Sequence, residues 1–194
     1  DTAGQALVLS DGRRLPYDRL LVATGGLSAQ PPIPGIQSER VAGLRTLADA
    51  GRIIELATSA RRAAVIGGGY IGLEAAYALR RRGLEVVVIE MMPHILYANL
   101  DEVAAGIIAV DLAQEGIDLR TGSDKQVMQI EDGDGGLALL LRSGERIAAD
   151  FAVCAVGVRA NLDLVRATPI RTEQGILVDD YLETSVPNVY AAGD

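Results

Sequence analysis

The residues whose types and spacing could bind a charged ligand are the glycines of the run Gly-Gly-Gly-Tyr-Ile-Gly at 67–72. They form a G-x-G-x-x-G that follows an apolar segment and precedes a helical pattern. Gly67 permits a tight strand-to-helix turn, Gly69 lets a pyrophosphate approach the backbone, and Gly72 lets the helix pack close to the sheet. The diphosphate would lie against free N–H groups at the positive helix end. The motif predicts a dinucleotide site, although a merely tight turn is the alternative. The predicted site also includes Gly68, Tyr70 and Ile71.

An acidic residue, Glu90, ends the next apolar segment, 23 residues after Gly67. A dinucleotide fold holds the adenosine ribose with an acidic residue near this spacing. Its carboxylate would accept hydrogen bonds from the ribose hydroxyls and would repel a 2′-phosphate. The next residues are Met91, Met92 and Pro93, so no cation follows to bind that phosphate. The pattern favours NADH over NADPH, and a solvated acid at the end of a strand is the alternative.

Glu74 is a second candidate. The sequence predicts a helix over 70–82, with Glu74 in its first turn, where the helix dipole stabilises a carboxylate in any case. The alternative to a catalytic or binding role is therefore that Glu74 only stabilises the start of the helix. For Tyr70 the alternative is an amphipathic side chain that packs over the turn. Glu74 is expected to flank the stripe that faces the sheet. That stripe is predicted to consist of Ile71, Ala75, Ala78 and Leu79.

Two further side chains have reactive chemistry but carry no functional prediction. Cys154 lies within an apolar strand, where it is expected to be a small buried hydrophobic residue, because a reactive thiol needs exposure and a cationic neighbour. His94 follows Pro93 in a connecting loop and is expected to be solvated.

The surrounding segments alternate between short apolar runs and helical patterns. Strands are predicted at 63–67, 86–90 and 117–121, and helices at 47–59, 70–82 and 101–115. This order is the doubly wound α/β pattern, a parallel sheet covered on both faces. We therefore predict a Rossmann-like, three-layer dinucleotide-binding domain.

The segments on either side complete the predicted fold. Short strands at 125–130, 137–142 and 146–148 are joined by links too short for a crossover helix, so they predict a β-meander, and 151–156 returns as a buried strand. Near the start, Asp11-Gly12 is a hairpin signal followed by a second apolar strand at 19–24. Prolines at 31–34 predict an extended connector between domains.

Composition narrows the classes of function. The chain has 194 residues, 49% of them hydrophobic, and a net charge of −8, which argues against a nucleic-acid-binding surface. No apolar run approaches the ~20 residues of a membrane helix, and no signal peptide is recognisable. One cysteine and one histidine exclude an internal disulfide, a cysteine zinc site and a histidine-rich metal site. We expect a cytoplasmic protein with no metal, membrane or nucleic-acid partner.

The motifs together resemble a known family. The sequences YDRLLVATGG (17–26), GGGYIGLEAAYALRRRG (67–83), VVVIE (86–90), AVGVRAN (155–161) and TSVPNVYAAGD (184–194) are similar to those of the FAD-dependent pyridine nucleotide–disulfide oxidoreductases. The similarity is greatest to the coenzyme A disulfide reductase, NADH oxidase, nitrite reductase and ferredoxin reductase branches. The thioredoxin reductase branch is excluded, because it carries a C-x-x-C pair that this chain lacks.

The resemblance implies a central fragment of a larger flavoprotein. Residues 1–36 would end a first FAD-domain segment, 37–159 would form the NAD(H)-binding domain, and 160–194 would start a second FAD-domain segment. The parent enzyme would transfer a hydride from NADH to FAD and pass electrons to an acceptor that is left open; a homodimeric parent is compatible with the resemblance. The fragment alone is expected to be inactive and not to retain FAD.

The resemblance also assigns roles by motif position. Gly67, Gly69 and Gly72 would meet the diphosphate and Glu90 the adenosine ribose. Glu74, the one catalytic candidate, would lie near the nicotinamide amide and the flavin, with Tyr70 beside the nicotinamide. The other implied cofactor contacts are Gly157 for the dinucleotide and Thr24, Gly25 and Asp194 for FAD. Ala160 departs from the family's usual G-x-x-P-N, here GVRAN, which puts the local turn in doubt.

Two alternatives from other classes stay open. The chain could be a nucleotide-binding or sensing module without turnover. It could also be a methyltransferase, which uses a similar glycine-rich turn and acidic strand end. The predicted meander, the Ala-Thr-Gly strand and the terminal Gly-Asp argue against a methyltransferase.

Overall fold

A computed structural model describes residues 1–194, which form two compact units. The larger unit comprises residues 28–157, and the smaller unit comprises residues 1–27 together with 158–194. The chain therefore passes between the units twice. The proline-rich stretch at 31–34, expected to be the connector, belongs to the larger unit.

The proline stretch belongs there because its neighbours pack into that unit's core. Ile33 and Ile36 join one of its hydrophobic clusters. The carbonyl of Pro34 accepts a hydrogen bond of 2.8 Å from the backbone N–H of Ile130. A rigid extended segment with apolar residues can line a core as readily as it links domains, so its composition alone does not locate the boundary.

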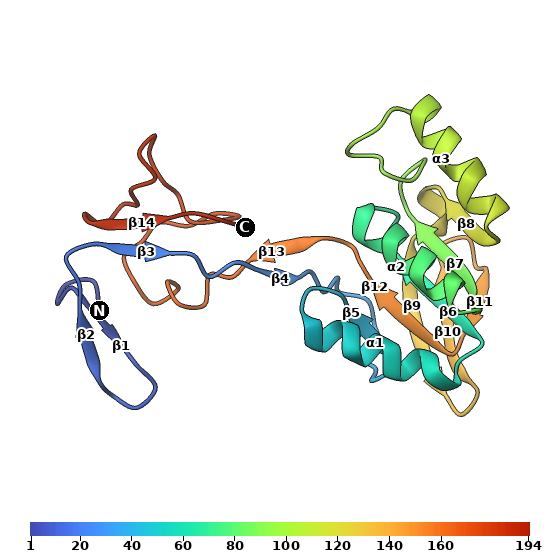
Figure 1. Cartoon of the computed structure of the whole chain (residues 1–194), viewed down its shortest axis with the longest axis horizontal. Coiled ribbons are helices and arrows are strands. Elements are labelled where there is room, and N and C mark those ends of the chain that lie inside the picture. Colours follow the sequence, from blue (N-terminus) through green and yellow to red (C-terminus); the bar gives the residue numbers. More distant parts are fainter. The chain divides into compact units, whose positions relative to one another are not determined.

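The larger unit is built on a five-stranded parallel sheet (Figure 1). Its order is β5-β12-β6-β7-β8, so the strand that returns last in the chain, β12, pairs with β6 at the centre. The strands are β5 (Val41–Gly43), β6 (Arg62–Ile66), β7 (Glu85–Glu90), β8 (Ile117–Thr121) and β12 (Phe151–Cys154). Three helices connect them, namely α1 (Leu47–Ser59), α2 (Tyr70–Arg81) and α3 (Glu102–Gln114).

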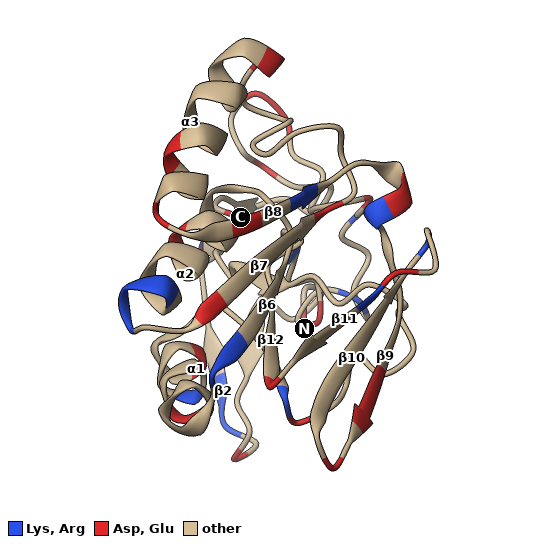
Figure 2. Ribbon diagram, turned by 90° about the vertical axis from the view of Figure 1, so that its right-hand side faces the viewer, with Lys and Arg blue, Asp and Glu red and all other residues tan.

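Different layers cover the two faces of this sheet (Figure 2). All three helices pack on one face, against side chains such as Val65 and Val88. An antiparallel meander covers the other face, against Ala64, Ile66 and Ala152. The meander consists of β9 (Val127–Gly133), β10 (Gly136–Leu141) and β11 (Arg146–Ala149), and a short 3₁₀ turn, η1 (Ser123–Lys125), precedes it. The predicted three layers and the predicted meander are confirmed.

Local signals explain where the helices begin and end. Thr46 and Asp49 form a capping box at the start of α1: the Thr46 hydroxyl accepts from the Asp49 N–H, and the Asp49 carboxylate accepts from the Thr46 N–H. Gly83 and Gly116, with φ of 91° and 82°, follow α2 and α3 in the left-handed conformation that ends many helices. None of the three helices is both long and apolar enough to cross a bilayer.

The buried face of α2 differs from the predicted stripe. Ile71 and Ala78 are exposed, whereas Leu73 and Ala76 are buried beside Ala75 and Leu79. Helical periodicity leaves the rotation of a stripe uncertain by one position. In the structure Gly72 and Leu73 both lie on the buried face, and a Cβ on Gly72 would lie 2.0 Å from the carbonyl oxygen of Gly67.

The smaller unit holds two separate strand pairs besides a hairpin. In the hairpin, β1 (Ala6–Val8) pairs antiparallel with β2 (Arg14–Pro16). The apolar strand β3 (Leu20–Val22) does not extend this hairpin but pairs in parallel with the distant β14 (Val189–Ala191). The third pair joins β4 (Gly26–Ser28) to β13 (Val158–Ala160). The hydrophobic cluster of the smaller unit includes the buried side chains of Val22, Val165 and Val189.

Asp150, just before β12, ties the amino ends of two central strands together. One oxygen of its carboxylate accepts hydrogen bonds from the backbone N–H groups of Arg61 (2.7 Å) and Arg62 (2.9 Å) at the start of β6. These two amide hydrogen bonds hold the pKa of Asp150 below its usual range. The interaction therefore stabilises the ionised carboxylate in the folded state.

We expect Asp150→Ala to lower the free energy of unfolding by about 1–2 kcal/mol at neutral pH, because two charge-assisted hydrogen bonds are lost at a half-buried position. A carboxyl with a depressed folded-state pKa stabilises the fold above its unfolded-state pKa, and this contribution disappears as the pH falls through the lower folded-state pKa. Urea unfolding at neutral and acidic pH should show the difference from wild type shrinking in acid. Asp134→Ala, in the exposed β9–β10 turn, is the control, and an equal loss in both variants would contradict the assignment.

Candidate functional site

The glycine run lies at the carboxyl edge of the parallel sheet, between β6 and α2. The backbone N–H of Gly67 donates to the carbonyl of Ile89 at the end of β7 (2.9 Å). On the other side, the N–H of Ala155 after β12 donates to the carbonyl of Ile66 (2.8 Å). The turn is thus held between the ends of both neighbouring strands, at the edge where open α/β sheets bind their ligands.

The first and third glycines are required by close packing. Gly67 has a φ of 108°, and a Cβ there would lie 2.4 Å from the carbonyl oxygen of Ala155. A Cβ on Gly72 would lie 2.0 Å from the carbonyl oxygen of Gly67, so the helix starts in contact with the turn. No side chain fits at either position without moving the backbone.

The second glycine of the motif, Gly69, leaves open space in front of α2. A Cβ on Gly69 would meet no heavy atom within 4 Å. Gly69 is also the N-cap of α2, and no side chain caps the helix there. The first N–H groups of the helix have no intrahelical partner, and the helix dipole adds partial positive charge to them. This end of α2 is therefore suited to an anion such as a diphosphate.

Glu90 is fixed beside this turn by two backbone amides. One carboxylate oxygen accepts from the N–H of Gly68 (2.7 Å), and the other accepts from the N–H of Met92 (2.8 Å). The side chain is half-buried, and a Cβ on Gly68 would lie 3.0 Å from the Cβ of Glu90. The structure thus brings Glu90 together with the glycine run, and each oxygen keeps lone pairs for further hydrogen bonds.

The segment after Glu90 holds the other side of the turn, which the sequence analysis missed. The N–H of Leu96 donates to the carbonyl of Gly68 (2.8 Å), so both backbone polar groups of Gly68 are bonded. Ile95 is buried, and its side chain lies 3.2 Å from the position of a Gly68 Cβ. Two consecutive apolar residues in a predicted loop, Ile95 and Leu96, are the sequence feature that could have indicated this packing.

The expectation of a solvated His94 is wrong. His94 is half-buried, its Nδ1 lies 2.9 Å from the carbonyl oxygen of Ile95, and its ring centroid lies 5.0 Å from that of Tyr97. The chain turns back at Leu96, whose φ is 53°, and this local turn brings the two rings together. Such a turn at a non-glycine residue has no sequence signal.

The structure also changes the setting of Glu74. The helix begins at Tyr70, and its first turn holds no acidic residue, so Glu74 opens the second turn instead of lying in the first. Its side chain is exposed and has no hydrogen-bond or ion-pair partner within the chain. Stabilisation by the helix dipole falls off within the first turn, which weakens the interpretation of Glu74 as a plain helix-start acid.

Other predicted cofactor contacts lie near the same edge of the sheet. Tyr70 and Ile71, at the start of α2, are 56% and 49% exposed. Gly157 follows β12 with a φ of 112°, and a Cβ there would meet nothing within 4 Å. By contrast, Cys154 is buried in the core, as predicted, and this burial raises the pKa of its thiol, which makes the thiol a poor nucleophile.

The three predicted FAD contacts belong to the smaller unit. Thr24 and Gly25 follow β3, and Asp194 follows β14, its parallel neighbour. The Thr24 hydroxyl donates to the carbonyl of Asn161 (2.8 Å), and the N–H of Asn161 donates to the carbonyl of Gly25 (2.8 Å). The structure therefore places all three residues at the carboxyl ends of one strand pair.

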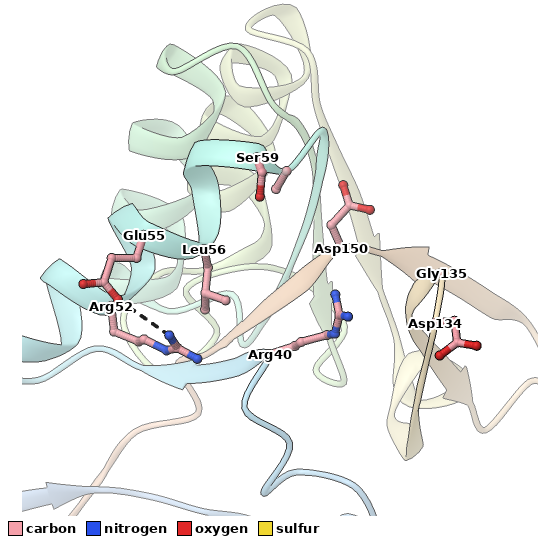
Figure 3. Close-up of a pocket in the computed structure, with 9 residues that line it drawn as sticks. Arg40, Arg52, Glu55, Leu56, Ser59, Asp134, Gly135 and Asp150 are labelled. Atoms are coloured by element: carbon pink, nitrogen blue, oxygen red, sulfur yellow. Dashed lines mark ion pairs between the residues drawn. The ribbon is translucent and has the colours of Figure 1, made fainter.

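A hollow of about 370 Å³ lies at the opposite, amino edge of the parallel sheet (Figure 3). It is lined by polar residues from α1, the β9–β10 turn and the segment before β12. Most of its charges are already engaged: Arg40 pairs with Asp132 (3.2 Å), Arg52 with Glu55 (3.6 Å), and Asp150 with two backbone amides. The helix N-terminus without a side-chain cap, that of α2, lies at the carboxyl edge instead.

The family described as pyridine nucleotide-disulphide oxidoreductase matches residues 1–194. The assimilatory nitrate reductase electron transfer subunit of Bacillus subtilis (strain 168) is 36% identical over 194 residues, which are 100% of this chain and 25% of that protein.

Two solved structures share the fold over the whole chain. The water-forming NADH oxidase of Lactobacillus brevis, bound to NADH, is 30% identical with a TM-score of 0.89, covering 100% of this chain and 44% of that one. An engineered NADPH oxidase made from it, bound to NADPH, matches with the same identity, coverage and TM-score. This chain spans less than half the length of these relatives. The chain belongs to the pyridine nucleotide–disulphide oxidoreductase family.

Proposed function

We propose that this chain is the NADH-binding portion of a flavoprotein oxidoreductase that transfers a hydride from NADH to FAD and passes the electrons to an acceptor. The observation that carries the proposal is the Glu90 carboxylate, held 2.7 Å from the Gly68 amide beside an uncapped helix N-terminus. A fixed carboxylate next to an anion-binding helix end matches the two chemical features of an adenosine diphosphate: a ribose diol and a diphosphate.

The charge pattern supports NADH as the nucleotide. In the engineered NADPH oxidase, one of the five substitutions removes an aspartate and two introduce arginine. Here the acid, Glu90, is present, and Met91, Met92 and Pro93 supply no cation after it. A 2′-phosphate beside Glu90 would face a carboxylate without a compensating charge.

Within the proposal, each group of residues has a binding role. The N-terminus of α2 from Gly69 holds the diphosphate, and Glu90 accepts from the ribose hydroxyls. Glu74, exposed and without a partner, accepts from the nicotinamide amide and orients the ring. The cofactors, when bound, supply the redox chemistry, so no side chain of this chain needs to act as nucleophile or base.

FAD would meet the carboxyl ends of β3 and β14. Gly25 and Gly193 adopt φ of 67° and 106°, and a Cβ on Gly193 would meet no heavy atom within 4 Å. Thr24 and Asp194 stand beside these glycines. The family match argues against the methyltransferase alternative, while binding without turnover is distinguished by the kinetic prediction on Glu74 below.

The nucleotide preference tests Glu90. We expect the chain to bind NADH more tightly than NADPH by about 1–3 kcal/mol, because an unpaired phosphate dianion would lie beside a carboxylate. Glu90→Gln, which keeps size but loses the charge, should narrow the gap. Calorimetric titration with both nucleotides measures it, and Glu85→Gln, at the exposed far end of the same strand, is the matched control. Equal affinities of the wild type for NADH and NADPH would contradict the role of Glu90 at the ribose.

Flavin retention tests the smaller unit. We expect the 194-residue chain, produced alone, to purify colourless. Its FAD contacts are limited to the ends of a two-stranded sheet, and residues 1–27 contain no G-x-G-x-x-G to hold the FAD diphosphate. Visible absorbance of the purified chain decides this, and a yellow preparation with stoichiometric flavin would refute the expectation.

The kinetic prediction concerns Glu74 in the full-length enzyme. We expect Glu74→Ala to slow flavin reduction by NADH about 10- to 100-fold, ~1.4–2.7 kcal/mol of barrier, because hydride transfer depends on near-contact geometry. The Kd for NADH should change far less, since the diphosphate and ribose contacts supply most of the affinity. Stopped-flow reduction of Glu74→Ala, Glu74→Gln and the exposed control Arg81→Ala provides the measurement. A wild-type rate in Glu74→Ala would leave Glu74 as a surface acid of the helix.

A further inference from the structure

Helix α3 presents three apolar side chains to solvent in one row. Val103, Ile107 and Val110 are 76%, 64% and 56% exposed. Their spacing of four and three residues places them on one face of the helix, here called the α3 stripe. The opposite face is the packed one: Ala105 is buried there, and Ile108 and Leu112 contact the core.

Two physical arguments make this row unusual for a surface that stays in water. Single exposed apolar residues are common, as with Leu47 on α1, but an aligned row is typical of a surface that another molecule covers. Valine and isoleucine are also weaker helix formers than the straight-chain residues that usually fill exposed helix positions. The three residues of the α3 stripe therefore lower the helix propensity of α3, and burial within this chain does not compensate for that cost.

The charges around the stripe are all of one sign. Residues 101–119 contain no Lys or Arg, and Figure 2 shows α3 with acidic bands alone. At 100° per residue, Glu102 and Asp111 flank the stripe on its two sides. The carboxylates of Glu102, Asp111 and Glu115 are exposed and have no ion-pair partner. The acids of this segment are Asp101, Glu102, Asp111, Glu115 and Asp118.

A cation from α2 reaches only the end of α3. The guanidinium of Arg80 donates to the backbone carbonyls of Glu115 (2.8 Å) and Leu84 (3.2 Å), so it caps the helix end. Asp101 accepts from the N–H of Ala104 as the N-cap, and Asp118 pairs with Arg120. The acids beside the stripe itself are left without compensation.

We propose that the α3 stripe is a docking surface for a basic amphipathic segment of a partner protein, with aliphatic side chains that cover Val103, Ile107 and Val110 and Lys or Arg residues that pair with Glu102 and Asp111. Charge selects this occupant over two others. A second copy of the chain would set the same acids against each other, on molecules of net charge −8. An anionic membrane surface would be repelled by the same carboxylates.

The test uses defined helical peptides and the full 194-residue chain. One peptide of about 18 residues, long enough to form a helix, carries leucines on one face flanked by Lys and Arg. A second peptide has Glu in place of every Lys and Arg. Fluorescence anisotropy should show the basic peptide binding at least about tenfold more tightly than the acidic one, with an affinity that falls as salt rises.

Matched variants separate the stripe from general attraction between opposite charges. Ile107→Gln with Val110→Gln keeps the net charge and should weaken binding of the basic peptide at least about tenfold, about 1.4 kcal/mol. Leu47→Gln, an 89% exposed apolar residue on α1, should leave it unchanged. Equal binding by the double variant, or by the acidic peptide, would overturn the proposal. So would a concentration-dependent dimer in sedimentation velocity, or binding to phosphatidylglycerol vesicles, that the double variant abolishes.

Discussion

The close approach of three backbone segments at Gly67 is the constraint on which the candidate site depends. The turn after β6 is bonded to the end of β7, faces the carbonyl of Ala155 after β12, and touches the start of α2. A Cβ at Gly67 or Gly72 would separate these segments, because each would meet a carbonyl oxygen at 2.4 or 2.0 Å. With both glycines in place, α2 starts directly at the sheet edge and its free N–H groups point past that edge.

The position of Glu90 follows from this arrangement. Because β6 and β7 are neighbours in register, the end of β7 lies beside the glycine turn, and the Gly68 N–H reaches the carboxylate. The carbonyl of Gly68 accepts a hydrogen bond from the N–H of Leu96. The segment after Glu90 is therefore held to the turn from the other side. The Glu90 carboxylate, the charge that would discriminate between nucleotides, is thus held in place by hydrogen bonds from two backbone amides.

Much of this could be predicted from the sequence because the signals are local. Helix α1 is found at the predicted residues, since its capping box and its periodicity agree. The glycine motif and Glu90 lie together because strand, turn and helix are consecutive in the chain. One prediction that failed depends on a contact far apart in the sequence. Parallel pairing of β3 with β14 joins the two ends of the chain, and no local pattern encodes it.

Other errors have equally specific causes. The stripe of α2 was misplaced because periodicity alone does not fix the rotation of a helix. In the structure Gly72, which approaches the turn at Gly67, lies on the buried face. The contact between the rings of His94 and Tyr97 depends on the left-handed backbone conformation of Leu96. A leucine does not indicate such a conformation, so the sequence does not predict the contact.

The two edges of the parallel sheet differ in how far their polar groups are already hydrogen-bonded, and this difference favours ligand binding at one of them. At the amino edge, Asp150 accepts the N–H groups of Arg61 and Arg62, and the surrounding arginines pair with acids. At the carboxyl edge, Glu90 plays a comparable part for Gly68 and Met92, yet the first N–H groups of α2 have no side-chain cap. Unsatisfied donors with a helix dipole behind them attract an anion, and the neighbouring carboxylate limits which anion fits. The asymmetry between the two edges therefore favours an anion site at the carboxyl edge, and this argument does not rest on the family resemblance.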